Sequence, residues 1–204
     1  MKTTYIDIIR HGEPEGGNVF RGRTDHSLTA RGIEQFQQRV QRLDCEWNTV
    51  ISSPLTRCKQ SAELFATEYN LPLHIEPKFA EIHFGAWENR CIETVMAEEN
   101  ISQMWQDPMN FCAPQGEHTA ELQQRTLIGW QDILKNHAEN RVLLVTHGGV
   151  MRVLAQHLLE LAPNAMNKLS LPYAAVMSFK VIESEYQGEQ QQWVSLVSMD
   201  GTEL

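Results

Sequence analysis

Two histidines in this chain stand directly after apolar, strand-like segments, and each is followed by glycine. His11 follows Thr4–Ile9 and Arg10, and His147 follows Arg141–Thr146. In a parallel α/β sheet, ligands bind at the carboxyl ends of the strands. We therefore expect the two imidazoles to face each other across one pocket. That arrangement suggests phosphoryl transfer through a histidine nucleophile.

The neighbours of both histidines are suited to holding an anion. The planar guanidinium fork of Arg10 can bind the non-bridging oxygens of a phosphate. Gly12 lets the backbone approach a ligand closely. Gly148 and Gly149 are expected to leave accessible N–H groups where a helix begins. The alternative for each histidine is a structural role, bonded to a backbone carbonyl in a tight turn.

Two further charged residues belong to the same hypothesis. Arg57 lies one turn into a helix expected to begin at Ser53-Pro54. A helix N-terminus favours anions, so an arginine there is unfavourable for helix stability and indicates a function, although a solvated surface arginine is the common alternative. Glu81 could protonate a leaving oxygen and then deprotonate water. No spacing rule selects Glu81 among the 26 acidic residues.

The apolar pattern predicts alternating strands and helices. We expect strands at 4–9, 49–52, 73–75 and 141–146, helices at 29–43, 53–70, 119–136 and 150–161, and a hairpin of 174–183 with 192–198 turning at Gly188. Residues 91–135 are expected to be mostly helical, with interruptions at 107–108 and 113–116. Alternating elements predict an α/β fold, a three-layer α/β/α sandwich with a mostly parallel sheet.

Composition excludes several classes of function. A net charge of −9 argues against nucleic acid or an anionic membrane as the main partner. No apolar run is long enough to span a membrane, and no secretory signal opens the chain. The cysteines are scattered and predict free thiols in a reducing cytoplasm, with a disulfide in an exported protein as the alternative: Cys45, Cys58, Cys91 and Cys112.

The eight histidines show no H-x-x-x-H or H-x-H pair, so the sequence gives no support for a metallohydrolase. We expect neither a metal nor a cofactor.

Taken in order, the motifs resemble those of the histidine phosphatase superfamily, the phosphoglycerate mutase-like enzymes. The resemblance covers nearly the whole chain and rests on Arg10–Glu13, Ser52–Arg57, Glu81–Gly85 and His147-Gly148, with Leu28-Thr29, Gly32 and Gln35 similar to the entry into the family's first helix. It implies the phosphoglycerate mutase-like form of the α/β/α sandwich. It also implies one domain over residues 1–204, with a mostly helical insertion at about 85–120 over the active site.

The resemblance implies a role for each site residue. His11 would be the nucleophile that becomes phosphohistidine, and Glu81 would be the proton donor and later the base. His11 should then be neutral and His147 charged. The phosphoryl group would be bound by Arg10, Arg57, His147, Gly148 and Asn18. The sequence departs from the family near Asn18, where Pro14 replaces the common threonine or serine and the loop at 16–18 is short.

The segment between Glu81 and His147 is shorter than in the mutases and implies a more open pocket. Within it, the motifs at 87–88, 105–108 and 114–117 resemble the α-ribazole phosphatases of cobalamin biosynthesis, although His118 stands where serine is common. The resemblance therefore implies a metal-independent phosphatase acting on a small phosphomonoester, α-ribazole 5′-phosphate or its cobamide form.

Several alternatives remain open. They are a broad-specificity small-molecule phosphatase, a phosphoglycerate mutase, and a non-catalytic phospho-ligand binder on the same fold. His83 and His118 are candidate substrate contacts or merely exposed loop residues. Trp87 and Trp105 are candidates for stacking on a base or for core packing. The oligomeric state is open.

Overall fold

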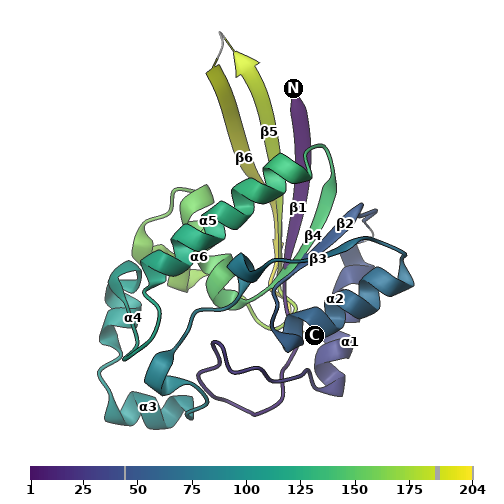
Figure 1. Cartoon of the computed structure of the whole chain (residues 1–204). Helices are drawn as coiled ribbons and strands as arrows, with labels where there is room; N and C mark the ends of the chain where they lie inside the picture. Colours follow the sequence, from purple (N-terminus) through teal and green to yellow (C-terminus); the bar gives the residue numbers. More distant parts are fainter. Residues whose placement is uncertain (44, 187–188, 204) are drawn as a thin grey trace.

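The computed structural model describes residues 1–43, 45–186 and 189–203. Within these residues the backbone forms one six-stranded sheet in the order β3-β2-β4-β1-β5-β6 (Figure 1). The strands are β1 (Lys2–Arg10), β2 (Thr49–Ser52), β3 (Leu73–Ile75), β4 (Arg141–Thr146), β5 (Val176–Tyr186) and β6 (Glu189–Asp200). Four strands are parallel: β1 pairs with β4, β4 with β2, and β2 with β3. β5 runs antiparallel to β1, and β6 runs antiparallel to β5.

The register of the parallel strands places the site. Arg10 at the end of β1 lies opposite Thr146 at the end of β4, and Ser52 at the end of β2 lies opposite Val145. The residues that follow these strands therefore emerge side by side at one edge of the sheet. His11 and His147 are two of them.

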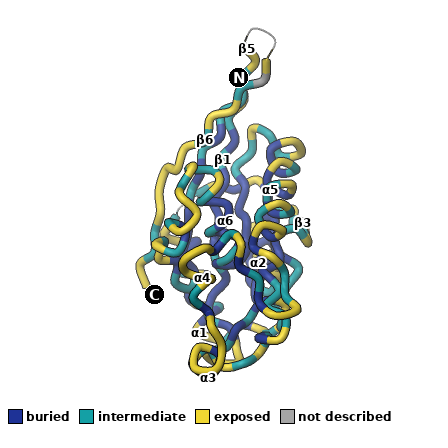
Figure 2. The backbone as a smooth tube through the Cα atoms, turned by 90° about the vertical axis from the view of Figure 1, so that its left-hand side faces the viewer, coloured by how far each residue is buried: buried dark blue, intermediate teal, exposed yellow. Residues whose placement is uncertain are grey.

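Helices cover both faces of the sheet. α1 (Ala30–Leu43) and α2 (Thr56–Glu68) pack on one face, and α5 (Thr119–Asn136) and α6 (Gly148–Leu158) pack on the other. In Figure 2 the central strands lie between the helices and are coloured as buried. This is the predicted three-layer α/β/α sandwich.

The sequence of β4 shows why both faces are covered. Its side chains point alternately to opposite faces of the sheet. Val142 and Leu144 enter the core under α5 and α6, whereas Leu143 and Val145 enter the core under α1 and α2. A strand that is apolar at every position needs a cover on each side.

The region between β3 and α5 forms a smaller helical layer beside the sheet. It contains α3 (Ile92–Glu98), α4 (Ser102–Gln106) and the 3₁₀ turns η1 (Pro77–Phe79), η2 (Gly85–Trp87) and η3 (Pro108–Asn110). A further turn, η4 (Pro163–Lys168), follows α6. A third apolar cluster anchors this layer; it consists of Phe20, Trp87, Val95, Ile101, Phe111 and Ala113.

Most predicted boundaries agree with the structure, and those at 49–52, 73–75, 119–136 and 141–146 agree residue for residue. The helix expected to begin at Ser53-Pro54 instead begins at Thr56, with Leu55 as its N-cap, and the Ser53 hydroxyl lies 2.6 Å from His147 Nε2 in the site. α6 runs from Gly148 to Leu158, earlier at both ends than the expected 150–161, and the strands of the hairpin are longer than expected. The turn predicted at Gly188 lies outside the described residues.

No helix in the described part of the chain is both long enough and apolar enough to cross a membrane. The cysteines Cys45, Cys58, Cys91 and Cys112 are free thiols.

Candidate active site

A cavity of about 350 Å³ opens where the parallel strands end. Five of the predicted site residues line it: Arg10, His11, Asn18, Glu81 and Gly148. The other two, Arg57 and His147, are fully buried beside His11 and do not line the cavity. The sheet edge therefore brings the predicted residues into one place, in two layers.

The two histidine rings are in contact. Their centroids lie 5.2 Å apart and their planes are inclined by 63°. This proximity follows from the pairing of β1 with β4, because each ring belongs to the first residue after its strand. The two imidazoles therefore lie together at the carboxyl ends of β1 and β4, although only His11 lines the cavity.

The hydrogen bond of His11 fixes its tautomer. Its Nδ1 lies 2.7 Å from the carbonyl oxygen of Gly12, and a carbonyl only accepts, so Nδ1 carries the hydrogen. In the neutral ring, Nε2 then holds a lone pair. Burial, followed by the charges of Arg57 and Arg10, lowers the pKa of His11 well below its usual value. His11 is therefore neutral at neutral pH and has the electron pair that a nucleophile needs.

The surroundings of His147 disfavour the charge that was expected on its ring. Burial, followed by the charges of Arg57, His11 and Arg10, lowers the pKa of His147 well below its usual value. A further cation is disfavoured in a group of positive charges out of contact with water. A dianionic phosphoryl group would oppose this repulsion and favour protonation of the ring.

Arg57 is held by the loop that follows the first motif. Its Nη1 donates to the carbonyl of Thr24 at 2.9 Å, and its Nη2 donates to that of Gly22 at 2.7 Å. Within the described part of the chain, the buried Nε atoms of Arg57 and Arg10 have no hydrogen-bond partner. Unpartnered buried N–H groups are costly, so they indicate a ligand that accepts from them.

Glu88 orders that loop, a role for which no local sequence pattern is a signal. Its carboxylate accepts from the N–H groups of Gly22, Arg23 and Thr24 and from the hydroxyl of Thr24. Burial alone would raise the pKa of Glu88, but these hydrogen bonds outweigh burial and lower it. A charged Glu88 thus fixes the backbone whose carbonyls hold Arg57.

Glu81 faces the cavity next to the start of α6. Its Oε2 accepts from the N–H of Gly149 at 3.1 Å, and its Oε1 accepts from the N–H of Ile82 at 3.0 Å. The N–H of Gly149 was expected to be accessible to a ligand. It is instead occupied by Glu81, and of the two glycine amides only that of Gly148 remains as a candidate donor.

Asn18 lies at the mouth of the cavity. Its side-chain amide donates to Glu93 Oε1 of α3 at 2.6 Å. The loop that carries Asn18 is thereby tied to the helical layer. A contact between Asn18 and a phosphate would require this amide to change partner.

The cavity residues that the sequence interpretation missed include Arg21, Arg152 and Tyr173. Arg152 follows Gly148 by one helical turn, so its position on the face of α6 towards the site was a usable signal. The guanidinium of Arg10 lies 4.5 Å from the ring centroid of Tyr173, and that ring lies 5.8 Å from the ring of His11. No local pattern marks Tyr173.

The candidate substrate-side residues separate into two groups. Trp87 is 3% exposed and packs in the third apolar cluster, so it belongs to the core, whereas Trp105 is 51% exposed and lines the cavity. His83 and His118 do not line the cavity. The N–H of His118 donates to Glu121 at the beginning of α5.

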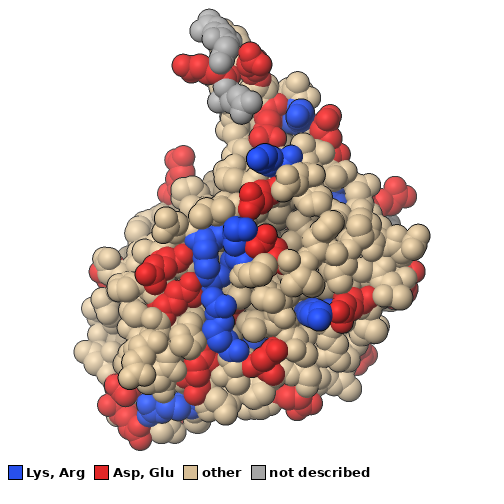
Figure 3. Space-filling model, viewed as in Figure 1, with Lys and Arg blue, Asp and Glu red and all other residues tan. Residues whose placement is uncertain are grey.

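The charge distribution favours an anion despite the net charge of −9. Figure 3 shows basic side chains gathered in a band across the middle of one face, between acidic ones. Inside the cavity three arginines, Arg10, Arg21 and Arg152, accompany one carboxylate, Glu81. Among the described residues, no group of three or more histidine, cysteine, aspartate or glutamate side chains is arranged to hold a metal ion.

Comparison with known proteins agrees with this geometry. The family described as histidine phosphatase superfamily (branch 1) matches residues 6–196. A protein from Erwinia tasmaniensis named probable phosphoglycerate mutase GpmB is 30% identical, with 81% of this chain and 80% of the relative covered.

Two solved structures are also similar. The α-ribazole phosphatase from Shigella flexneri has a TM-score of 0.76 and 27% identity, covering 96% of this chain and 95% of that one. The phosphoserine phosphatase from Entamoeba histolytica, in complex with 3-phosphoglyceric acid, has a TM-score of 0.80 and 25% identity, covering 98% of each chain.

Proposed function

Because this chain belongs to the histidine phosphatase superfamily, we propose that it is a metal-independent phosphomonoesterase that works through a phosphohistidine. The observation that carries the proposal is the state of His11. Its Nδ1–H is bound to the Gly12 carbonyl, its pKa is lowered, and its ring lines the cavity. A buried neutral imidazole whose Nε2 holds a lone pair is a competent nucleophile.

In the first step, Nε2 of His11 attacks phosphorus. A P–N bond forms while the bond from phosphorus to the alcohol oxygen breaks. The Glu81 carboxyl gives its proton to that oxygen, so the alcohol leaves neutral. Glu81 lines the same cavity as His11, as this role requires.

In the second step, water attacks phosphorus from the side that the alcohol has left. Glu81, now a carboxylate, removes a proton from the water. The P–N bond breaks, its electron pair returns to Nε2, and inorganic phosphate is released.

Positive charge and backbone donors balance the phosphoryl oxygens during both steps. We assign this role to Arg10, Arg57, His147 and Gly148, with Asn18 at the mouth of the cavity. The assignment is supported by the unpartnered Nε atoms of the two arginines within the described residues. It needs no divalent cation, because guanidinium and imidazolium groups supply the compensating charge.

The substrate that we propose is α-ribazole 5′-phosphate or its cobamide form. The apolar part of the cavity lining supports a large, partly aromatic leaving group, since it includes Phe20, Phe84, Met104, Trp105, Phe111 and Met166. The similarity to the α-ribazole phosphatase from Shigella flexneri supports the same choice.

Two alternatives have support of their own. A broad-specificity phosphatase would fit the open cavity. A phosphoglycerate mutase would fit the name of the relative from Erwinia tasmaniensis.

We also propose that residues 1–204 form one domain, in which the segment at about 85–120 covers the active site and selects the leaving group. Cavity residues from this segment, such as Ile92, Met104 and Phe111, support the second part. A cytoplasmic location is supported by the four free thiols, which persist in reducing compartments.

A rate comparison tests the proposed substrate. kcat/KM would be measured for α-ribazole 5′-phosphate, 3-phosphoglycerate and a panel of sugar phosphates. We expect the benzimidazole nucleotide to be preferred. Similar values for all substrates would favour the broad-specificity alternative. Interconversion of phosphoglycerates that depends on a bisphosphorylated primer would favour the mutase.

A further inference from the structure

Arg125 of α5 forms a bidentate ion pair with Glu117, which lies just before that helix. The pair contacts the backbone of the segment that carries Glu81. Arg125 Nε lies 2.6 Å from Glu117 Oε1, and Nη2 lies 2.9 Å from Oε2. Both side chains are largely removed from solvent, at 19% and 14% exposure. Such bidentate pairs fix direction as well as distance.

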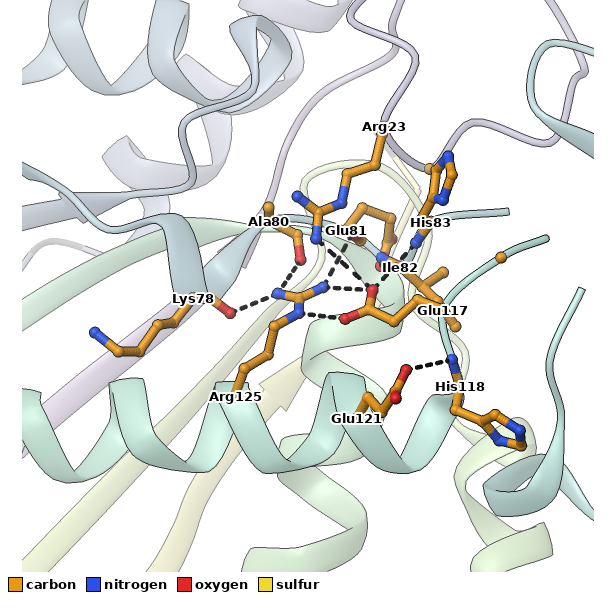
Figure 4. Close-up of polar contacts among 12 residues, drawn as sticks. Arg23, Lys78, Ala80, Glu81, Ile82, His83, Glu117, His118, Glu121 and Arg125 are labelled. Carbon is orange, nitrogen blue, oxygen red and sulfur yellow. Dashed lines mark hydrogen bonds and ion pairs between the residues drawn. The ribbon is translucent and has the colours of Figure 1, made fainter. Parts of the chain in front are cut away.

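The remaining donors of Arg125 bind the segment that carries Glu81. Nη1 donates to the carbonyls of Lys78 and Ala80, each at 2.7 Å, and Nη2 donates to the carbonyl of Glu81 at 3.1 Å (Figure 4). One guanidinium therefore gathers three carbonyls within four consecutive residues. Only the planar five-donor fork of arginine can do this while binding a carboxylate.

Glu117 holds the same segment on its other side. Its Oε2 accepts from the N–H of His83 at 3.2 Å, and its own N–H donates to the His83 carbonyl at 2.8 Å. Arg23 adds an ion pair at 3.7 Å. Burial alone would raise the pKa of Glu117, but hydrogen bonds and charge from Arg125 outweigh burial and lower it. Glu117 is therefore ionised. The Arg125–Glu117 ion pair thus holds the backbone of residues 78–83, with Arg125 binding residues 78–81 and Glu117 binding His83.

The segment needs this support because it has little of its own. Residues 80–83 lie between the turns η1 and η2 and belong to no strand or helix, and residues 78 and 79 belong only to the short turn η1. The Glu81 carboxylate is held by two backbone N–H groups, and one of these belongs to the neighbouring residue Ile82. The direction of the carboxylate thus depends on the course of the backbone.

We propose that Arg125, locked by Glu117, is a positioning residue that aims the Glu81 carboxyl at the leaving oxygen of the substrate. This inference rests on the proposed role of Glu81 as proton donor. Every guanidinium nitrogen of Arg125 is bound to Glu117 or to a backbone carbonyl of residues 78–81, so Arg125 acts through the backbone and not on the substrate. A displacement of about 1 Å in a reacting group can lower a rate by about a hundredfold.

Two substrates with different leaving groups distinguish a positioning role of Arg125 from a general structural role. p-Nitrophenolate leaves with little help from an acid, whereas the alkoxide of 2-glycerophosphate needs a proton. We expect Arg125→Gln to lower kcat on 2-glycerophosphate by about 10- to 100-fold and on p-nitrophenyl phosphate by less than about threefold. KM for both should change little, and Arg125→Lys should restore part of the loss.

Matched variants complete the experiment. Arg90→Gln removes an arginine whose partners, Glu98 and Glu99, lie on the exposed part of the helical layer, and it should leave both rates unchanged. Glu117→Gln is a milder test of the same pair and should give a smaller loss with the same selectivity. It replaces Arg125→Gln if thermal melting shows that the latter is unfolded.

Glu81→Gln, made in parallel, distinguishes the two ways in which the inference can fail. The double variant Arg125→Gln with Glu81→Gln should be no slower on 2-glycerophosphate than Glu81→Gln alone. If Arg125→Gln slows both substrates equally while Glu81→Gln remains selective, Arg125 is structural and only the positioning role is overturned. If Glu81→Gln also slows both equally, the proton-donor role fails and the positioning role fails with it.

Discussion

Glu81 and Gly149 are in such close contact that no side chain fits between them. The Gly149 N–H donates to Glu81 Oε2 at 3.1 Å, and a methyl group on Gly149 would lie 2.3 Å from Glu81 Oε1. The start of α6 therefore serves both proposed catalytic functions. Gly148 lines the cavity that we propose receives the phosphoryl group, and Gly149 holds the proposed proton donor.

Because of this contact, we expect Gly149→Ala to lower the activity on alkyl phosphates selectively. Alanine favours a helix over glycine by up to about 1 kcal/mol, so the folded protein should not be greatly destabilised. The displaced Glu81 should lower kcat on alkyl phosphates by about tenfold or more while aryl phosphates are nearly spared. Steady-state kinetics on both substrate classes, with a thermal melt, checks this. An equal loss on both classes would contradict the proposed role of the contact.

Stability should fall as the solution becomes acidic. The folded-state pKa values of His11 and His147 lie well below the value near 6.5 of an unperturbed histidine. Between these values the unfolded chain binds protons that the folded protein does not, so the free energy of unfolding decreases as the pH falls below about 6.5.

Denaturant titrations between pH 7.5 and about pH 5 measure this loss, since that range brackets the unperturbed histidine pKa. The His11→Gln variant should lose less stability over the same range, because one of the two groups is gone. A variant curve parallel to that of the wild type would exclude a lowered pKa for His11.

Removal of divalent metal should leave activity intact. The guanidinium groups of Arg10 and Arg57, together with a His147 ring protonated by the bound phosphoryl group, supply the charge that a metal would otherwise provide. Dialysis against EDTA, followed by assay on p-nitrophenyl phosphate, should change kcat by less than about twofold, a barrier change of under about 0.5 kcal/mol. A loss of activity that zinc or magnesium restores would refute the metal-independent mechanism.

The two tryptophans should respond to mutation in opposite ways. Trp87→Ala should destabilise the fold by about 3–5 kcal/mol, because Trp87 is buried against Phe20 and Phe111. Trp105→Ala should change stability by less than about 1 kcal/mol and raise KM for bulky substrates, because its exposed ring lines the cavity. Melting temperatures and KM values for both variants test whether Trp87 belongs to the core and Trp105 to the substrate cavity. A stable Trp87 variant with altered KM would reverse the assignment.

Structural features that depend on neighbouring residues in the chain could be predicted from the sequence. The strand before His147 was found because Val142–Val145 is apolar without a break, and His11 was found because it follows a β-branched strand and precedes glycine. Since parallel strands end at one edge of the sheet, the meeting of the two histidines followed from these local signals. The predicted start of α2 was too early, and the contact between the Ser53 hydroxyl and His147 could not be predicted because the two residues are distant in sequence.

Supporting residues could not be predicted, because their signals are not local. Arg125 binds carbonyls more than forty positions earlier, and Glu88 binds N–H groups more than sixty positions earlier. Neither residue type distinguishes itself from other surface charges. The lowered pKa of His147 could not be predicted for a related reason. It depends on how deeply the ring is buried and on which cations the fold brings to it.

Trapping the covalent intermediate tests the central claim most directly. The enzyme would be mixed with p-nitrophenyl phosphate, stopped with alkaline denaturant within milliseconds, and digested for mass spectrometry, with His11→Ala treated in the same way. The proposed mechanism predicts an acid-labile phosphate on Nε2 of His11 in the wild-type protein and none in the variant. A phosphate on a different residue, or full turnover by His11→Ala, would contradict it.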